Sequence, residues 1–79
     1  MGYHLKEIEK GELGKFSKIK EEFQELEDAV NQYDEILILC ELSDLYGAME
    51  LYIENFGMNM QSLEKFSNKT KQSFKEGKR

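Results

Sequence analysis

Apolar side chains recur at alternating intervals of three and four residues through the first half of the chain. This spacing places them along one side of an α-helix and predicts an amphipathic helix that packs against other helices. Because Gly11 and Gly14 weaken earlier turns, we expect the helix to begin between Glu12 and Ser17 and to end near positions 32–34. The residues of this apolar seam are Phe16, Ile19, Phe23, Leu26, Val30 and Tyr33.

Two further helices follow from local signals. Asp34 can cap a second helix with its side-chain oxygen, and we expect that helix to span about 35–55, with Gly57 as a left-handed stop. A third helix is expected over about 59–74. No proline occurs in the 79 residues to interrupt these helices. The sequence therefore predicts an all-α fold of about three helices.

A chain of this length is too small to complete its own core. Domains of such size bury only about 60% of the surface that the unfolded chain exposes. The single cysteine allows no internal disulfide to compensate. Three helices also do not close a four-helix bundle, and the second helix is apolar around most of its circumference. We therefore expect a four-helix-bundle-type core formed by oligomerisation.

Residues 1–10 are expected to form an N-terminal lead-in segment before a helical domain over 11–79. Tyr3 and Leu5 alternate with polar neighbours, a pattern compatible with a short extended piece. His4 is the single histidine of the chain, and we expect it on the surface.

The formal net charge of −5 is distributed unevenly along the chain. Residues 1–20 carry a net +2, residues 21–64 contain twelve acids and no basic residue, and residues 65–79 carry a net +5. An acidic middle repels phosphate, and the basic ends lack interleaved aromatic residues, so we expect no nucleic-acid partner. No apolar run reaches membrane-spanning length and no signal-peptide pattern is present, so we expect a cytoplasmic protein that does not bind membranes.

Two carboxylates of the second helix fall within its apolar surface. On a helical wheel, Glu41 and Asp44 lie one turn apart inside the apolar arc. Ser43, Glu50 and Glu54 share the water-facing side. A buried carboxylate costs on the order of several kcal/mol unless it is protonated, paired or bound to a cation. Since the helix contains no basic residue, a divalent cation is the simplest compensation.

Carboxylates with the same spacing lie on the first helix. Glu22 and Glu25 flank the apolar seam at i, i+3, as Glu41 and Asp44 do on the second helix. Two antiparallel helices joined by a short turn can present all four side chains to one site. Oxygen-only ligands select Mg²⁺ or Mn²⁺ rather than zinc. We therefore predict a metal site formed by Glu22, Glu25, Glu41 and Asp44.

The two acidic blocks, EEFQE at 21–25 and ELSD at 41–44, form the pattern EExxE followed by ExxD. With this pattern the chain resembles the MazG-like all-α nucleoside triphosphate pyrophosphohydrolases, a superfamily that includes dimeric dUTPases and phosphoribosyl-ATP pyrophosphohydrolase. The flanking stretches 18–20 and 44–48 also look like those of short phage and bacterial members. The resemblance extends over about residues 11–79.

The resemblance implies hydrolysis of a nucleotide between its α and β phosphates, which yields a nucleoside monophosphate and pyrophosphate. It also implies Mg²⁺ bound by the four carboxylates, Glu21 as a catalytic residue near the attacking water, and a homodimer or homotetramer. Four carboxylates and a triphosphate carry more negative charge than one or two Mg²⁺ ions neutralise, so cationic side chains should contact the substrate. The candidate substrate-binding residues are Lys18, Lys69 and Lys71, with Asn68 as a polar contact.

The alternative function is that of a non-catalytic helical oligomer or adaptor whose acids hold a structural cation. It predicts stability that depends on the metal, without turnover. The presence of all four ligand positions favours the enzyme, because a degenerate relative would be expected to lose at least one. The sequence leaves open which nucleotide is the substrate.

Overall fold

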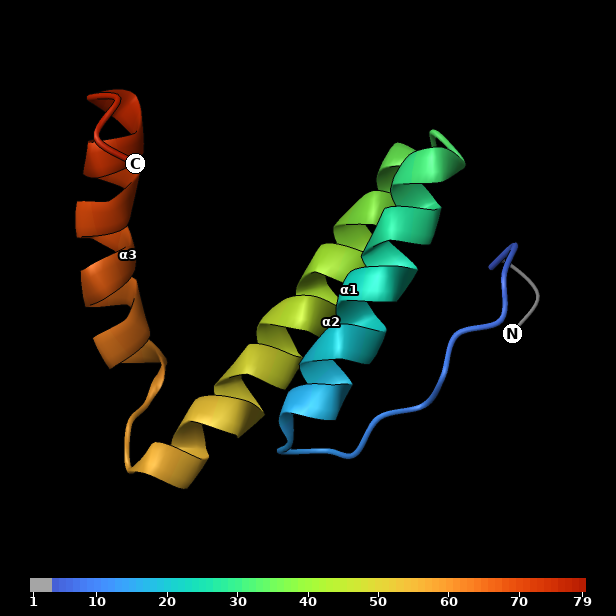
Figure 1. The fold of residues 1–79 in the computed structure, drawn as a ribbon, viewed down its shortest axis with the longest axis horizontal. Coiled ribbons are helices and arrows are strands. Elements are labelled where there is room, and N and C mark those ends of the chain that lie inside the picture. Colours follow the sequence, from blue (N-terminus) through green and yellow to red (C-terminus); the bar gives the residue numbers. More distant parts are fainter. Residues whose placement is uncertain (1–3) are drawn as a thin grey trace.

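Three helices make up the regular structure of residues 4–79, the part of the chain that the computed structural model describes (Figure 1). No strand is present within this range, so the predicted all-α class is confirmed. Tyr3, whose pattern is compatible with a short extended piece, lies outside the described residues. The elements are α1 (Phe16–Asn31), α2 (Glu35–Ile53), a 3₁₀ turn η1 (Glu54–Phe56) and α3 (Met60–Lys75).

Residues with capping side chains or left-handed backbone fix the helix ends. The side chains of Asp34 and Asn59 accept hydrogen bonds from the backbone amides of Leu37 and Ser62, each at 3.1 Å. These bonds satisfy amide groups that the first turns of α2 and α3 leave without helical partners. After η1, Gly57 adopts φ 73°, in the left-handed region that ends many helices. The predicted helix boundaries are therefore confirmed to within about two residues.

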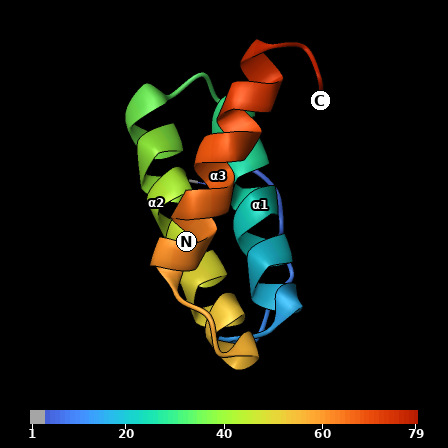
Figure 2. The same ribbon diagram turned by 90° about the vertical axis from the view of Figure 1, so that its left-hand side faces the viewer.

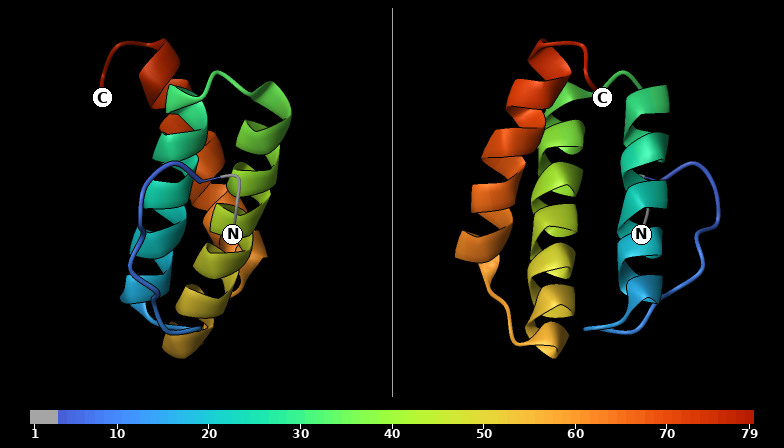
Figure 3. Two further views of the ribbon diagram at one scale, coloured as in Figure 1. Left: turned by 90° about the vertical axis from the view of Figure 1, so that its right-hand side faces the viewer. Right: turned by 60° about the vertical axis from the view of Figure 1, so that its left-hand side comes forward.

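α1 and α2 form an antiparallel hairpin and pack along their length (Figures 1 and 2). α3 diverges from this hairpin in Figure 1, and in the view at the right of Figure 3 its projection falls on the side of α2 away from α1. The segment 4–15 contains no helix and folds back along α1. In the described part of the chain, no helix combines the length and hydropathy needed to cross a bilayer.

The residues that are fully buried in this hairpin are small or acidic rather than large and apolar. Ala29 and Ala48 are buried there, whereas Phe16 and Phe23 of the predicted seam remain 62% and 54% exposed. Most of the predicted seam of α1 is therefore exposed in the single chain, although the ring of Phe16 lies 6.2 Å from that of Tyr52 on α2. The buried acids are Glu21, Glu22, Asp28 and Glu41.

Large apolar side chains are exposed on all three helices of the single chain. They include Phe23 on α1, Leu39 and Tyr46 on α2, and Phe66 and Phe74 on α3. Exposed apolar surface of this extent is typical of surfaces that bury against a partner. The oligomer stays a prediction, and these faces are the surfaces that it would cover.

Candidate functional site

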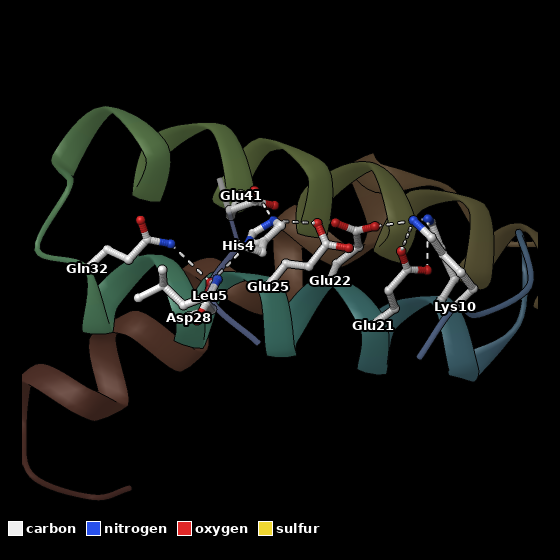
Figure 4. Close-up of polar contacts among 10 residues, drawn as sticks. His4, Leu5, Lys10, Glu21, Glu22, Glu25, Asp28, Gln32 and Glu41 are labelled. Atoms are coloured by element: carbon white, nitrogen blue, oxygen red, sulfur yellow. Dashed lines mark hydrogen bonds and ion pairs between the residues drawn. The ribbon is translucent and has the colours of Figure 1, made fainter. Parts of the chain in front are cut away.

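Carboxylates from α1 and α2 meet in the middle of the hairpin (Figure 4). Glu22 and Glu41 are buried, with exposed fractions of 5% and 2%. One carboxylate oxygen from each of Glu22, Glu41 and Asp44 lies within 4.8 Å of the other two, and the same holds for Glu21, Glu22 and Glu25. The four predicted ligands therefore lie in two overlapping groups that share Glu22.

Asp44 differs from the sequence interpretation in its exposure. We expected it on a buried face together with Glu41, but in the single chain Asp44 is exposed while Glu41 is buried. The reason is that α1 covers only one side of α2, and Asp44 lies at the edge of the covered strip. Its carboxylate nevertheless remains within reach of Glu22 and Glu41.

Lys18 lies beside the acidic pair at the start of the first block. Its Nζ is 2.9 Å from Glu22 Oε2 and 3.1 Å from Glu21 Oε1. The spacings i, i+3 and i, i+4 bring all three side chains to one side of α1. The hydrogen bond to Glu22 raises the pKa of Lys18, so the amine stays charged. Of the predicted substrate-binding residues, Lys18 is the one that the structure places at the carboxylates.

Glu21 is held by both the helix and the N-terminal segment. Its Oε1 accepts hydrogen bonds from the Gly11 amide at 2.9 Å and from Lys18 at 3.1 Å, while Lys10 Nζ lies 3.6 Å from Oε2. Burial raises the pKa of Glu21, but the donors Gly11 and Lys18 lower it more, to about 2. Glu21 is therefore ionised at neutral pH, and its Oε2 retains capacity to accept a hydrogen bond from water.

Glu25 and Glu41 have the opposite electrostatic character. Burial, the hydrogen bond with Glu21 and the charges of Glu22 and Glu41 raise the pKa of Glu25 to about 7. Burial and the nearby charges of Asp44 and Glu22 also raise the pKa of Glu41, against the opposing effect of a histidine. Raised values mean that the charged carboxylates are poorly stabilised by the chain itself, and a bound cation would reverse this.

That histidine is His4, and our expectation that it lies on the surface is wrong. Its side chain is 11% exposed and inserts among carboxylates of both helices (Figure 4). Nδ1 lies 3.0 Å from Asp28 Oδ2, and Nε2 lies 3.1 Å from Glu25 Oε1 and 3.2 Å from Glu41 Oε2. The lead-in segment therefore contributes directly to the acidic centre.

Asp28 and Lys10 also belong to this region, although sequence reasoning did not select them. Asp28 continues the acidic flank three residues beyond Glu25, so helical spacing contained the signal for it. No comparable signal marked His4 or Lys10, because the approach of an irregular segment to a helix is a tertiary contact with no periodicity in the sequence.

Two buried oxygen atoms in the centre have no hydrogen-bond partner among the described residues. They are Glu22 Oε1 and Glu41 Oε1, and the second oxygen of each residue contacts Lys18 or His4. A buried carboxylate oxygen without a partner is costly and uncommon. Neighbouring ligands of Mg²⁺ are about 3 Å apart and opposite ones about 4 Å, and one oxygen from each of Glu22, Glu41 and Asp44 lies within 4.8 Å of the other two. The donor set therefore fits a hard divalent cation.

The remaining predicted substrate-binding residues lie elsewhere. Asn68, Lys69 and Lys71 are exposed on α3, and the structure of one chain does not bring them to the carboxylates. Lys71 lines an apolar hollow of about 540 Å³ between α2 and α3, together with Tyr46 and other side chains.

A cavity with three lysines lies between the N-terminal segment and α1. Its volume is about 540 Å³, within the range of small-molecule sites. Lys18 and Glu22 also line a second hollow of about 450 Å³ that reaches Asp44 on α2. The first cavity is lined in part by Lys6, Lys10, Lys18, Glu21, Glu22 and Glu25.

Comparison of the chain with protein-family models, with curated proteins and with solved structures yields no significant match.

Proposed function

We propose that this chain is a nucleotide pyrophosphohydrolase of the MazG-like kind that depends on a divalent cation. It would cleave a nucleoside triphosphate or related nucleotide between the α and β phosphates, releasing a nucleoside monophosphate and pyrophosphate. The observation that carries the proposal is a pair of buried oxygens on Glu22 and Glu41 that have no hydrogen-bond partner in the described part of the chain. The two residues lie on facing helices beside Asp44.

The proposed ligands of Mg²⁺ or Mn²⁺ are Glu22, Glu25, Glu41 and Asp44. When bound there, such an ion neutralises phosphate oxygens and lowers the pKa of a water molecule. Glu21 has a separate role in this proposal. Its Oε1 is fixed by Gly11 and Lys18, so Oε2 can orient the attacking water toward the phosphate.

Positive charge for the phosphates would come first from Lys18, which lines both hollows next to the ligands. Lys6 and Lys10 line the first cavity and could reach a phosphate chain there. We keep Asn68, Lys69 and Lys71 as candidates in the assembled protein, where α3 of a second subunit could approach the centre. Fixed cationic side chains beside transferring phosphates stabilise the charge that develops in the transition state.

The assembly that we propose is a homodimer or homotetramer. Its support is the extent of exposed apolar surface, which includes Phe16 and Phe23 on the predicted seam of α1. Burial of one such aromatic side chain contributes roughly 1.5–3 kcal/mol. Helices of two chains packed over these faces would form the bundle that one chain cannot close.

One observation favours the non-catalytic alternative. The N-terminal segment already occupies part of the centre, because His4 contacts Glu25 and Glu41 while Gly11 and Lys10 contact Glu21. A centre filled in this way could hold a structural cation without admitting a nucleotide.

A nucleotide panel separates the two functions. Purified protein with Mg²⁺ is incubated with canonical, deoxy and modified nucleoside triphosphates and with phosphoribosyl-ATP, and pyrophosphate and orthophosphate are measured separately. Pyrophosphate from at least one nucleotide supports the enzyme. Stabilisation by Mg²⁺ without any turnover across the panel supports the structural alternative.

A further inference from the structure

The imidazole of His4 contacts three carboxylates from two helices. Nδ1 lies 3.0 Å from Asp28, and Nε2 lies 3.1 Å from Glu25 and 3.2 Å from Glu41 (Figure 4). Octahedral bonds of about 2.1 Å place neighbouring ligand atoms about 3 Å apart. The oxygens of Glu25 and Glu41 therefore lie as far from Nε2 as neighbouring ligands of one ion do.

Asp28 determines which nitrogen of His4 faces the other two carboxylates. Its Oδ2 also accepts hydrogen bonds from the Leu5 amide at 2.9 Å and from Gln32 Nε2 at 3.0 Å. An ionised carboxylate can only accept, so Nδ1 of His4 is the donor in the contact with Asp28. Metal-binding histidines are oriented in this way, with a carboxylate at the nitrogen that does not bind the metal.

Glu41 supplies an independent indication of a ligand. Its side chain is 98% buried, since only 2% is exposed, and its Oε1 has no hydrogen-bond partner among the described residues. Oε2 faces His4, so one carboxylate can serve two neighbouring positions. The group of His4, Glu25 and Glu41 has its donor atoms within 4.8 Å of one another.

We propose that His4 Nε2, Glu25 and Glu41 form a mixed imidazole–carboxylate site for a first-row transition-metal dication such as Mn²⁺, with Asp28 as the positioning residue. This site differs from the oxygen-only group of Glu22, Glu41 and Asp44 by its nitrogen ligand. Imidazole favours transition metals over Mg²⁺. Binding releases any proton on Nε2 to solvent, because only the neutral nitrogen has a lone pair for the metal.

The proposal does not require nucleotide hydrolysis. It makes the N-terminal segment part of the metal centre, since the segment carries the ligand His4 and is held by Asp28 at one end and Glu21 at the other. A transition metal would thereby fix the segment against α1 and α2.

Pulsed electron paramagnetic resonance of the full chain with Mn²⁺ tests the ligand directly. The chain has a single histidine, so any imidazole nitrogen coupled to the bound Mn²⁺ belongs to His4. We expect ¹⁴N coupling in the natural-abundance protein and its replacement by ¹⁵N coupling after labelling histidine with ¹⁵N. Mn²⁺ bound without imidazole coupling would overturn the proposal, and so would a protein that binds no Mn²⁺.

Affinity measurements with two variants provide a second readout. His4→Gln should weaken Mn²⁺ binding by more than about tenfold and Asp28→Asn by about tenfold, whereas Mg²⁺ affinity should change less than about threefold. Circular dichroism confirms that each variant is helical, and the isotope experiment needs no variant. Equal losses for both metals would contradict the nitrogen ligand.

The outcomes separate this proposal from the proposed function. Imidazole coupling without pyrophosphate release supports the mixed site and rejects the hydrolase. Pyrophosphate release with Mg²⁺, from a protein whose bound Mn²⁺ shows no imidazole coupling, does the reverse.

Discussion

Glu22 of α1 and Glu41 of α2 are both buried in the same hairpin interface, and each has one carboxylate oxygen without a hydrogen-bond partner among residues 4–79. The other oxygen of each residue contacts a basic side chain: Glu22 contacts Lys18 of the same helix, and Glu41 contacts His4 of the N-terminal segment. The two helices thus enclose negative charge that the chain only partly compensates. A divalent cation would complete this centre, and the predictions below follow from that relationship.

Glu41→Gln should abolish stabilisation by Mg²⁺ without destabilising the metal-free protein. Without metal at about pH 8, the variant should be as stable as the parent or more stable by about 1 kcal/mol, because it removes a buried charge. The rise in melting temperature caused by Mg²⁺ should disappear. Thermal unfolding with and without Mg²⁺ measures both effects. Glu50→Gln, at an exposed position on α2, is the matched control and should retain the full response.

The metal-free protein should lose stability as the pH rises from about 5 to 8. Glu25 has a pKa of about 7 in the folded chain against an ordinary 4.5, so the folded state holds a proton that the unfolded state has released. The free energy of unfolding should therefore fall by on the order of 3 kcal/mol between about pH 5 and pH 8. His4 acts in the same direction, since its pKa is raised despite burial, mainly by the hydrogen bond with Asp28, and its contribution is lost as it deprotonates.

Glu21 should cause the protein to lose stability at acidic pH. Its pKa of about 2 lies below the ordinary 4.5, so its contribution is present above pH 4.5 and is lost as the pH falls toward 2. Chemical denaturation at several pH values should therefore show a maximum near pH 5 without metal. Mg²⁺ should restore stability at pH 8 and have little effect at pH 5. Metal-free stability that rises steadily from pH 5 to 8 would contradict these assignments.

Gly11→Ala should weaken the attachment of the N-terminal segment. A Cβ atom at Gly11 would lie 2.2 Å from the backbone oxygen of Ser17, so the segment must shift away from α1. We expect a loss of about 1–3 kcal/mol in the free energy of unfolding, together with a change in the NMR signals of His4. Gly47→Ala is the control, because nothing lies within 4 Å of the added atom and helix propensity favours alanine by about 1 kcal/mol. Equal stability of the Gly11 variant and the parent would show that the segment is not held as described.

The exposed apolar faces should be buried in solution. Phe23→Gln and Phe66→Gln change residues that are 54% and 68% exposed in one chain, so in a monomer each should alter stability by less than about 0.5 kcal/mol. We instead expect losses above about 1 kcal/mol and a smaller assembly by size-exclusion chromatography with light scattering. Glu27→Gln, exposed on α1, should change neither quantity. A parent protein that is monomeric at micromolar concentration would contradict the oligomer.

Local signals were sufficient to predict the helices. The helical periodicity, the cap at Asp34 and the stop at Gly57 act within a few residues of each other, and the structure has the helices, this cap and this stop where expected. The cap at Asn59 is a further local signal that the structure adds. Helical spacing also predicted that Glu22 and Glu25 face Glu41, because a short turn leaves an antiparallel pair few other arrangements.

Contacts of the irregular N-terminal segment could not be predicted in this way. His4 reaches Asp28 across 24 residues, and nothing in the spacing of the segment indicates that contact. The exposure of Asp44 and of Phe23 could not be predicted either, because it depends on what covers the hairpin. A helical wheel identifies apolar faces but not which chain covers them.

The most direct test of the account is pyrophosphate release by the purified full chain with Mg²⁺, compared with the variants Glu41→Gln and Asp44→Asn and the control Glu50→Gln. We predict that the parent and the control release pyrophosphate rather than orthophosphate from at least one nucleotide of the panel. The two ligand variants should lose at least about 99% of that rate, as expected when binding of the catalytic ion is lost. Full activity in both ligand variants, or no pyrophosphate from any nucleotide although the protein binds Mg²⁺, would contradict the proposed function.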